Sequence, residues 1–600
     1  MVHLLGAEAL HLEYPTRVVF DAVTLGVNEG DRIGVVGRNG GGKTSLLGML
    51  AGRVPPDSGR VTRRGGVRVG VLDQADTLDH TQTVGHTIVG DRPDHEWAGD
   101  GRVRDVIAGL VADIPWEATV GTLSGGQRRR VALAALLVGE WDVIVLDEPT
   151  NHLDVEGITW LAEHLRRRWP RNTGGLLVVT HDRWFLDEIC TATWEVHDEI
   201  VEPFEGGYAA YVLQRVERDR QAAASEAKRQ NLMRKELAWL RRGAPARTSK
   251  PKFRIDAANE LIADVPPPRD RVELSRLATA RLGKDVVDVL DVSVSFDGRP
   301  VLRDIEWRIG PGERTGILGA NGAGKSTLLG LVAGTISPDS GQVKTGKTVR
   351  VGVLDQELAE LAEIAGERVR EVLARTKATF VVDGRELTPA QLLERLGFPR
   401  EHLSARVADL SGGQRRRLHM LLVLLAEPNV LVLDEPTNDL DVDMLAAMED
   451  VLDSWPGTLI AVSHDRYFLE RVTDQQYAIL GGRLRHLPGG VDEYLRLRAG
   501  GASAAPPTGK AGPRPTGPVP AAGPAGLSGA ELRAAQKELA ATQRRLDRLA
   551  GQVAAAHANL SGHDPGDYEG ILRITRRVGD LEAEIASLEE RWLELSEQAS

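Results

Sequence analysis

Apolar and polar residues alternate in the same order in two stretches of the chain. Strand-like alternation covers residues 2–12 and recurs at 287–296. In each stretch a second short apolar strand follows, at 32–36 and at 314–318, and leads into a glycine-rich loop and then into helical periodicity. This order predicts a strand, a loop and a helix in both halves of the chain.

Two later runs, at 143–154 and 430–441, begin as continuous apolar strands. Strands of this kind are buried on both faces of a parallel sheet, as in α/β domains. Equivalent residues of the two halves lie at a nearly constant separation, which is 282 residues for Lys43 and Lys325, 287 for Asp147 and Asp434, and 283 for His181 and His464. We therefore interpret the chain as one α/β domain present twice.

The two glycine-rich loops read GRNGGGKT at 37–44 and GANGAGKS at 319–326. Glycine lets backbone N–H groups curl around phosphate oxygens, and the positive end of the following helix favours the anion. Lys43 and Lys325 are placed to reach the terminal phosphates, and the hydroxyls of Thr44 and Ser326 can ligate Mg²⁺. The predicted cradles comprise Gly37, Asn39, Gly40, Gly41, Gly42, Lys43, Thr44 and Ser45 in the first half, and Gly319, Asn321, Gly322, Ala323, Gly324, Lys325, Ser326 and Thr327 in the second.

Two adjacent acidic residues end each of the later apolar strands. Asp147 and Asp434 would be costly at the end of a buried strand unless they face a cation, so we predict that they coordinate Mg²⁺. The next residues, Glu148 and Glu435, point to the other side of the strand end, where they can polarise an attacking water.

The remaining segments do not repeat. The sequence predicts a first cassette at 1–208, a basic helical hairpin linker at 209–285, a second cassette at 286–498, a disordered Ala/Pro/Gly linker at 499–526 and a coiled-coil hairpin at 527–600. Leucine and other apolar residues recur every seven positions in the last segment, on both sides of SGHDPGD at 561–567. We expect an intramolecular antiparallel coiled coil, with a parallel dimer as the alternative.

Charge and composition narrow the functional class. The formal net charge of −12 argues against a protein that coats nucleic acid over its whole surface, yet residues 212–254 carry 13 Lys or Arg against 4 Asp or Glu. Cys190 is the single cysteine, which excludes an intramolecular disulfide. No apolar run approaches the length of a membrane span, and no signal peptide is evident at the start, so we expect a cytoplasmic protein.

At this point a resemblance can be stated. LSGGQRRR at 123–130 and at 410–417 is similar to the signature of ATP-binding cassette ATPases. Gln74 and Gln356 resemble the glutamine-loop residue of that family, and THDR at 180–183 and SHDR at 463–466 resemble its switch-histidine segment. Tyr14 and Phe296 stand where the family stacks an aromatic ring on adenine, although ordinary core aromatics are the alternative.

The resemblance implies that the two cassettes bind head to tail, with each ATP between the phosphate loop of one and the signature of the other. The first site would then combine Lys43, Thr44, Gln74, Asp147, Glu148 and His181 with Ser411, Gly412, Gly413 and Gln414. The second site would combine Lys325, Ser326, Gln356, Asp434, Glu435 and His464 with Ser124, Gly125, Gly126 and Gln127. Gln74 and Gln356 would serve both catalysis and Mg²⁺ binding, and both sites are expected to hydrolyse ATP.

Fused cassettes joined by a charged helical hairpin resemble the F subfamily of these proteins, and the C-terminal coiled coil resembles its Uup-type branch. The resemblance implies an ATPase that acts on the ribosome as a translation factor and contacts tRNA or ribosomal RNA through the basic linker. A monomer with intramolecular cassette pairing is expected. A purely spacing role for the linker remains the simpler alternative.

Other functions remain open from the sequence. A DNA-associated ATPase of repair or recombination would use the C-terminal hairpin, where Arg544, Arg545 and Arg548 could face Arg573, Arg576 and Arg577. Only 50 residues separate Gln74 from Ser124, so any arm inserted there must be short. The short linker tip makes an antibiotic-resistance role a weaker alternative. The energising subunit of a membrane transporter is the weakest one, because transporter cassettes are rarely fused by a basic hairpin.

Overall fold

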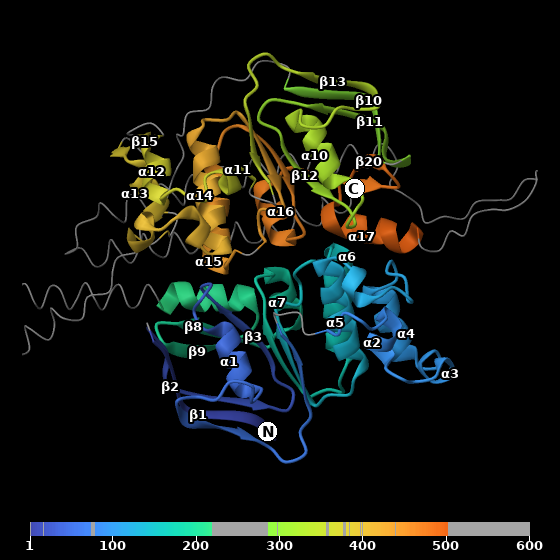
Figure 1. Cartoon of the computed structure of the whole chain (residues 1–600), viewed down its shortest axis with the longest axis vertical. Coiled ribbons are helices and arrows are strands. Elements are labelled where there is room, and N and C mark those ends of the chain that lie inside the picture. Colours follow the sequence, from blue (N-terminus) through green and yellow to red (C-terminus); the bar gives the residue numbers. More distant parts are fainter. Residues whose placement is uncertain are drawn as a thin grey trace, which may run out of the picture. The chain divides into compact units, whose positions relative to one another are not determined.

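Each half of the described chain folds as an α/β cassette around a parallel sheet (Figure 1). The computed structural model describes residues 2–15, 17–73, 78–218, 286–296, 298–355, 359–375, 380–382, 385–395, 398, 400–438 and 440–501. Both cassettes belong to one unit, Met1–Ala505. No helix within these described ranges is long and apolar enough to cross a membrane.

The main sheet of the first cassette has six strands, parallel except at the edge that β9 forms. Its order is β5 (Val69–Leu72), β6 (Val143–Asp147), β7 (Gly175–Val179), β3 (Arg32–Gly37), β8 (Ala192–His197) and β9 (Ile200–Glu205). A separate antiparallel sheet pairs β2 (Arg17–Asn28), β1 (His3–Tyr14) and β4 (Ser58–Arg63). Every residue of β6 and β7 is buried, which agrees with their continuous apolar sequences.

The helices of the first cassette lie between these strands in the chain. They are α1 (Lys43–Leu50), α2 (Val84–Val89), α3 (Asp94–Trp97), α4 (Gly101–Leu110), η1 (Val120–Thr122), α5 (Gly125–Val138), α6 (Val155–Arg167) and α7 (Arg183–Ile189). A further helix covers 208–218. One apolar cluster packs α1 between the main sheet and the β1 sheet, and another packs α2, α4, α5 and α6 on the opposite face.

The second cassette repeats this topology. Its main sheet has the order β14 (Val351–Leu354), β17 (Val430–Asp434), β18 (Thr458–Val462), β12 (Arg314–Leu318), β19 (Gln475–Leu480) and β20 (Arg483–His486). The second antiparallel sheet pairs β11 (Arg299–Ile309), β10 (Val287–Phe296) and β13 (Ser340–Thr345). A short hairpin of β15 (Phe380–Val382) and β16 (Arg385–Leu387) has no counterpart among the described residues of the first cassette.

Helices again connect the strands of the second cassette. They are α10 (Lys325–Ala333), α11 (Ala359–Glu363), α12 (Val369–Ala374), α13 (Pro389–Arg395), η2 (Arg400–Ser404), η3 (Val407–Asp409), α14 (Gly412–Leu425), α15 (Val442–Ser454), α16 (Arg466–Val472) and α17 (Gly490–Gly501). The two tandem α/β cassettes predicted from the sequence are thereby confirmed, including the strand, loop and helix order around both glycine loops.

The ends of both cassettes differ in detail from the expected boundaries. The helix at 208–218 continues past residue 208, and Tyr211 within it is buried in the core of the first cassette. In the same way α17 continues to Gly501, past residue 498. The tip of the predicted linker hairpin, the Ala/Pro/Gly segment beyond residue 501 and the predicted coiled coil at 527–600 lie outside the described residues.

Candidate functional site

The first glycine loop closes around the side chain of the lysine that follows it. Lys43 begins α1, and its Nζ donates hydrogen bonds to the carbonyl oxygens of Gly37 at 2.8 Å and Arg38 at 3.2 Å. Gly42, just before the helix, has a φ of 105°, and a Cβ there would lie 2.5 Å from a methyl carbon of Val19. Only glycine fits this position, so the loop conformation depends on it.

The second loop repeats this geometry. The Nζ of Lys325 donates to the carbonyl oxygens of Gly319 at 2.7 Å and Ala320 at 3.3 Å, and Gly324 has a φ of 102°. Burial lowers the pKa of both lysines from the usual value, while the nearby carboxylates oppose that shift. Each loop therefore presents a buried cation beside a run of backbone N–H groups at a helix start, which is an arrangement that binds phosphate.

An aspartate stands beside each lysine at the carboxyl end of a central strand. Asp147 ends β6 and hydrogen-bonds Thr44, and Asp434 ends β17 and hydrogen-bonds Ser326. Burial raises the pKa of both carboxyls, and the hydroxyl contacts and the lysines act against that shift. A carboxylate and a hydroxyl oxygen in hydrogen-bond contact are the types of ligand that a hard divalent cation such as Mg²⁺ prefers.

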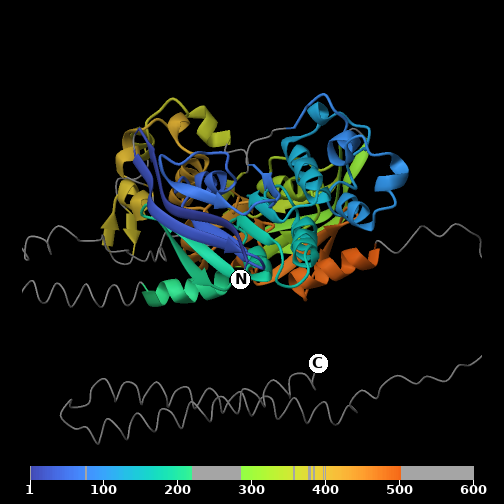
Figure 2. The same cartoon turned by 90° about the horizontal axis from the view of Figure 1, so that it is seen from below.

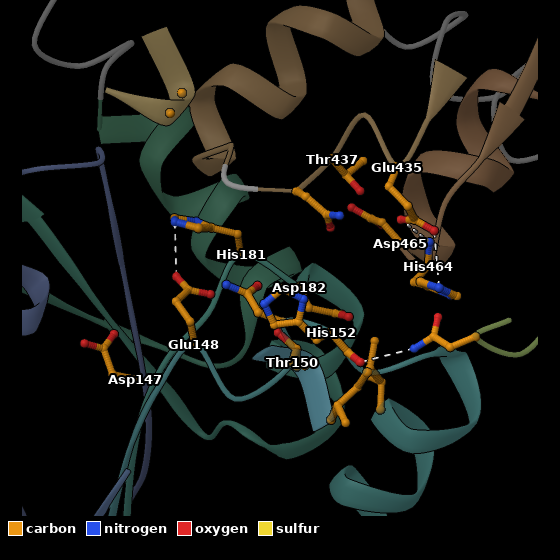
Figure 3. Close-up of a pocket in the computed structure, with 18 of the residues that line it drawn as sticks. Asp147, Glu148, Thr150, His152, His181, Asp182, Glu435, Thr437, His464 and Asp465 are labelled. Atoms are coloured by element: carbon orange, nitrogen blue, oxygen red, sulfur yellow. Dashed lines mark hydrogen bonds and ion pairs between the residues drawn. The ribbon is translucent and has the colours of Figure 1, made fainter. Parts of the chain in front are cut away.

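The next residue in each strand end contacts a histidine (Figure 3). His181 Nε2 lies 3.3 Å from Glu148 Oε1, and His464 Nε2 lies 3.2 Å from Glu435 Oε1. Both glutamates adopt a left-handed backbone, with φ values of 49° and 47°. A left-handed backbone at a non-glycine residue is strained, and it recurs here at equivalent positions of both cassettes.

Burial controls the protonation of this group. It raises the pKa of Glu435 to about 8 and lowers the pKa of His181 and His464 well below the usual range, with Lys43 and Lys325 adding to the shift of the histidines. The histidines are therefore neutral near pH 7 and act as hydrogen-bonding groups rather than as cations.

The two histidines differ in their second neighbour. His181 Nε2 lies 3.1 Å from the side-chain oxygen of Asn39, whereas His464 Nε2 lies 3.3 Å from the Nζ of Lys325. Both neighbours of His181 Nε2 are acceptors, so this nitrogen carries the proton. The two sites thus have the same residues but a different hydrogen-bond arrangement.

Each signature segment caps a helix. Ser124 caps α5 in a reciprocal capping box with Gln127, and Ser411 caps α14 in the same way with Gln414. The caps fix the first turn of each helix. The backbone N–H groups of that turn that remain without a partner point beyond the N-terminal end of the helix, where they can bind an anion.

Both phosphate loops and both signature segments line one cavity of about 1350 Å³. A single small-molecule pocket has a volume of roughly 300–1,000 Å³, so this cavity is large enough for more than one ligand. Its lining includes most of the predicted residues, namely Asn39, Gly40, Gly42, Lys43, Thr44, Ser45, Ser124, Gly126, Gln127, Asp147, Glu148, His181, Asn321, Gly322, Gly324, Lys325, Ser326, Thr327, Ser411, Gly412, Gly413, Asp434, Glu435 and His464.

Two aspartates that the sequence analysis did not select contact the phosphate loops across the cassette interface. Asp441 Oδ2 accepts a hydrogen bond from the backbone N–H of Asn39 across the cassette interface, at 3.2 Å. At the equivalent position with the cassettes exchanged, Asp154 Oδ2 accepts from the backbone N–H of Asn321 at 3.4 Å. The side-chain amide of Asn321 also donates to the His152 carbonyl oxygen, at 3.2 Å. The sequence could have revealed these two residues, because the repeated segments LDEPTNHLD and LDEPTNDLD end in Asp154 and Asp441.

The predicted aromatic residues lie at strand ends on the surface. Tyr14 ends β1 with 42% of its surface exposed, and its hydroxyl lies 3.4 Å from the Ser45 hydroxyl. Phe296 ends β10 and is 50% exposed. Neither is a core aromatic. Arg17, which the sequence analysis missed, lines the cavity and donates to the Gly40 carbonyl oxygen at 2.5 Å.

Gln74 and Gln356 lie outside the described residues. The remaining predicted contacts, Gly37, Gly41, Gly125, Gly319, Ala323 and Gln414, belong to the same loops and helix starts but do not line the cavity themselves.

Comparison with known proteins decides the family. A family model described as ABC transporter matches residues 20–151 and 302–438, a second with that description matches 194–275, and one described as ABC transporter C-terminal domain matches 532–597. The chain is 35% identical to the uncharacterized ABC transporter ATP-binding protein YfmR of Bacillus subtilis, over 99% of this chain and 98% of that one. It is also 35% identical to the energy-dependent translational throttle protein EttA of Mycobacterium tuberculosis, over 76% of this chain and 87% of the relative.

The chain belongs to the ABC-F family of ATP-binding cassette proteins. A solved archaeal ribosome recycling factor, aABCE1, shares the fold of this ABC-F chain, with a TM-score of 0.59 and 22% identity over 82% of the chain and 92% of the solved structure. The ABC-F protein is therefore an ATP-hydrolysing enzyme with two cassettes.

Proposed function

We propose that this ABC-F ATPase is a nucleotide-driven clamp that acts on the ribosome. The observation that carries the clamp is the single cavity lined by the phosphate loop and the signature helix start of both cassettes. ATP held there would touch both halves at once, so binding favours the closed arrangement and hydrolysis removes the bridging phosphate. The cavity also supports composite sites, in which Lys43 works with Ser411 and Lys325 with Ser124.

Each residue then has a role that its position supports. Lys43 and Lys325 bind the terminal phosphates. Glu148 and, when ionised, Glu435 orient and polarise the attacking water, and the neutral His181 and His464 lie against those glutamates at 3.3 and 3.2 Å. Thr44 with Asp147, and Ser326 with Asp434, would hold Mg²⁺, which neutralises charge on the phosphates when bound.

The ribosome as partner is inferred from relatives. EttA is named a translational throttle protein, and this chain covers 87% of the M. tuberculosis protein. The aABCE1 structure, similar in fold, is named a ribosome recycling factor. The basic segment at 241–254 carries Arg and Lys with a flanking Trp239, which suits contact with the backbone of tRNA or ribosomal RNA. The cytoplasm is the compartment in which we expect this activity.

Sedimentation tests the proposal. The double variant Glu148→Gln, Glu435→Gln should bind ATP without hydrolysing it and therefore stay closed. In a cell lysate with ATP it should travel with ribosomes through a sucrose gradient, and the same variant carrying Lys43→Ala and Lys325→Ala should stay near the top. If the ATP-trapped protein also remains near the top, the ribosome is not its partner.

The RNA contact has its own test. In the trapped background, replacing Arg241, Arg242, Arg247, Lys250, Lys252 and Arg254 with Gln should weaken co-sedimentation without changing ATP binding. Co-sedimentation that is unchanged across a range of salt concentrations would refute the contact, because phosphate contacts are salt-dependent.

A further inference from the structure

A second repeat lies where each cassette leads into an unrepeated segment. The helix at 208–218 precedes the linker, and α17 precedes the C-terminal segment. Tyr211 and Tyr494 are 283 residues apart, as are Arg215 and Arg498. The two helices are therefore equivalent parts of the duplicated cassette, although the segments that follow them are unrelated. We call them the exit helices.

The first exit helix is tied to both cassettes. Tyr211 is buried in the core of its own cassette, and its hydroxyl donates to Glu195 of β8 at 2.9 Å. Arg215, one turn later, makes two hydrogen bonds to the carboxylate of Asp443 in α15 of the other cassette, at 2.6 and 3.2 Å. Its Nε also lies 3.2 Å from Glu195.

The second exit helix makes the equivalent contact, from the second cassette to the first. Arg498 donates to the two carboxylate oxygens of Glu156 in α6 of the first cassette, at 2.8 and 3.0 Å. The Tyr494 hydroxyl donates to the same carboxylate at 2.5 Å. Val155, beside Glu156, is part of the apolar cluster of the second cassette that also contains Tyr494. Figure 1 shows α17 beside α6, and Figure 2 shows both exit helices along the same side of the cassettes.

The two acids of these pairs stand on helix turns that also contact the opposite phosphate loop. Asp441 caps α15 and accepts the N–H of Asn39, and Asp443 lies two residues later. Likewise Asp154 caps α6 and accepts the N–H of Asn321, two residues before Glu156. A helix turn moves as a rigid piece, so separation of the cassettes would break the phosphate-loop contact and the exit-helix contact together.

Each of these helix turns contacts both the opposite phosphate loop and an exit helix. We therefore propose that Arg215 and Arg498 are positioning residues, which couple nucleotide-dependent closure of the cassettes to the exit helices. Through these helices, closure would act on the segments 219–285 and 502–600. The proposal rests on the clamp proposed above. Its physical basis is that each bidentate pair exists only when the opposite cassette is in place, whereas the contacts of Tyr211 hold the helix to its own cassette in either state.

The two pairs are not equal in strength. Arg215 is the more buried arginine, with 16% of its side chain exposed against 44% for Arg498, and solvent screens the second pair more. Glu195 supports Arg215, while the equivalent position in the second cassette is Ala478. Arg38 of the first phosphate loop also lies 3.8 Å from Asp443, and Ala320 occupies the equivalent position. The Arg215 pair is therefore the stronger of the two arginine pairs, whereas the second exit helix also has the Tyr494 contact to Glu156.

Hydrogen exchange of the full chain in the Glu148→Gln, Glu435→Gln background tests the coupling. ATP should slow exchange in both exit helices of the parent. Arg215→Gln should abolish most of this protection at 208–218, with exchange about fivefold faster, and leave that of 490–501 intact. Arg498→Gln should do the reverse with a smaller effect, so each variant is the control for the other.

A change of the partner supplies the matched variant. Asp443→Asn, which removes the partner's charge and leaves Arg215 beside Glu195, should lower ATP-dependent protection at 208–218 as Arg215→Gln does. Arg215→Lys, which keeps the charge but not the bidentate geometry and is the variant most certain to fold, should give an intermediate result.

The outcomes separate this proposal from the clamp itself. Protection of the signature segments 124–127 and 411–414 by ATP reports closure. If ATP protects neither signature segment in the parent, the clamp fails and the coupling fails with it. If the signature segments are protected but the exit helices show no dependence on Arg215 and Arg498, only the coupling is overturned. Loss of protection at every segment in both variants would also overturn it, since the pairs would then only hold the interface.

Discussion

The backbone N–H of Asn39, in the first phosphate loop, donates to the carboxylate of Asp441 in the second cassette over 3.2 Å. Asp441 is buried and also caps α15 through its other oxygen, which accepts from the N–H of Met444 at 2.9 Å. One carboxylate therefore fixes the start of a helix in one cassette and the phosphate loop of the other. Asp154 of the first cassette and Asn321 of the second form the equivalent contact.

Replacement of Asp441 tests whether this contact supports hydrolysis. Asp441→Ala removes both the cap and the cross-cassette acceptor, and we expect kcat for ATP hydrolysis to fall by at least about tenfold, because misplaced reacting groups lose rate steeply. Asp441→Asn keeps an oxygen for the cap and should lose less. The measurement is steady-state phosphate release, with thermal unfolding to show that both variants fold. A kcat of Asp441→Ala equal to that of the parent would contradict the role.

The buried ion pair between Arg183 and Glu449 joins the two cassettes. The side chains are 6% and 0% exposed, and Arg183 also lies 3.1 Å from Asp465. Arg183→Ala removes one of the two arginines on the buried Glu449, which keeps Arg471 at 2.9 Å, so the cost should fall below the roughly 3–5 kcal/mol of a wholly unpaired buried carboxylate. We expect the melting temperature of the full chain, followed by scanning calorimetry, to fall by several degrees.

The control for this variant is Arg166→Ala. Arg166 pairs with Glu188 within the first cassette, and about half of its side chain is exposed. Pairs of this kind contribute about 0–1 kcal/mol, so the melting temperature should barely change. Equal destabilisation by the two variants would show that burial at the interface is not the cause.

Asp182 makes the stability of the interface depend on pH. Burial raises the pKa of its carboxyl to about 7, from a usual value of 3.8, and the charge of Asp465 adds to this, while Arg183 and Arg466 oppose it. Between these two values the folded chain holds a proton that the unfolded chain has lost, so stability from this group is present at low pH and is lost as pH rises through about 7.

Asp182→Asn should therefore raise the melting temperature at pH 8 by about 2 °C and change it less at pH 5. The amide oxygen can still accept the hydrogen bond from the N–H of Phe185 that caps α7. Asp100, a half-exposed cap of α4, provides the matched Asp100→Asn variant. A larger gain at pH 5 than at pH 8 would contradict the assigned direction of the pKa shift.

Tyr14 and Phe296 provide a test of nucleotide recognition. Both side chains are about half exposed at the ends of equivalent strands, so one face of each ring is open to stacking. Tyr14→Ala and Phe296→Ala should each raise the dissociation constant of ATP by about tenfold at their own site, since base stacking on an aromatic ring is worth about 1–3 kcal/mol. Tyr14→Phe and Phe296→Tyr should bind as the parent does in equilibrium fluorescence titrations. Unchanged affinity of the alanine variants would remove the stacking role.

The main residues of each cassette could be predicted from the sequence because their chemistry is local. Gly42 and Lys43 must be adjacent for the loop to curl around the ammonium group. Asp147 and Glu148 must follow a buried strand for their carboxylates to reach its end. Such constraints act over a few residues and therefore leave a readable pattern, and the duplication doubled that pattern. The position of the first exit helix was less visible, since its charged sequence resembles a linker. The 283-residue spacing of Tyr211 and Tyr494 is the signal in the sequence, and burial of Tyr211 agrees with it.

The sequence by itself determined two α/β cassettes, the residues of both phosphate loops and the acids beside them, because repeated local motifs specify them. Only the tertiary structure decided which residue of one cassette meets which residue of the other. Asn39 with Asp441, Arg183 with Glu449 and Arg215 with Asp443 are pairs separated by 402, 266 and 228 residues. No periodicity connects residues so far apart, and an Arg or Asp on a surface helix reads as an ordinary solvated charge until packing of the cassettes buries it against its partner.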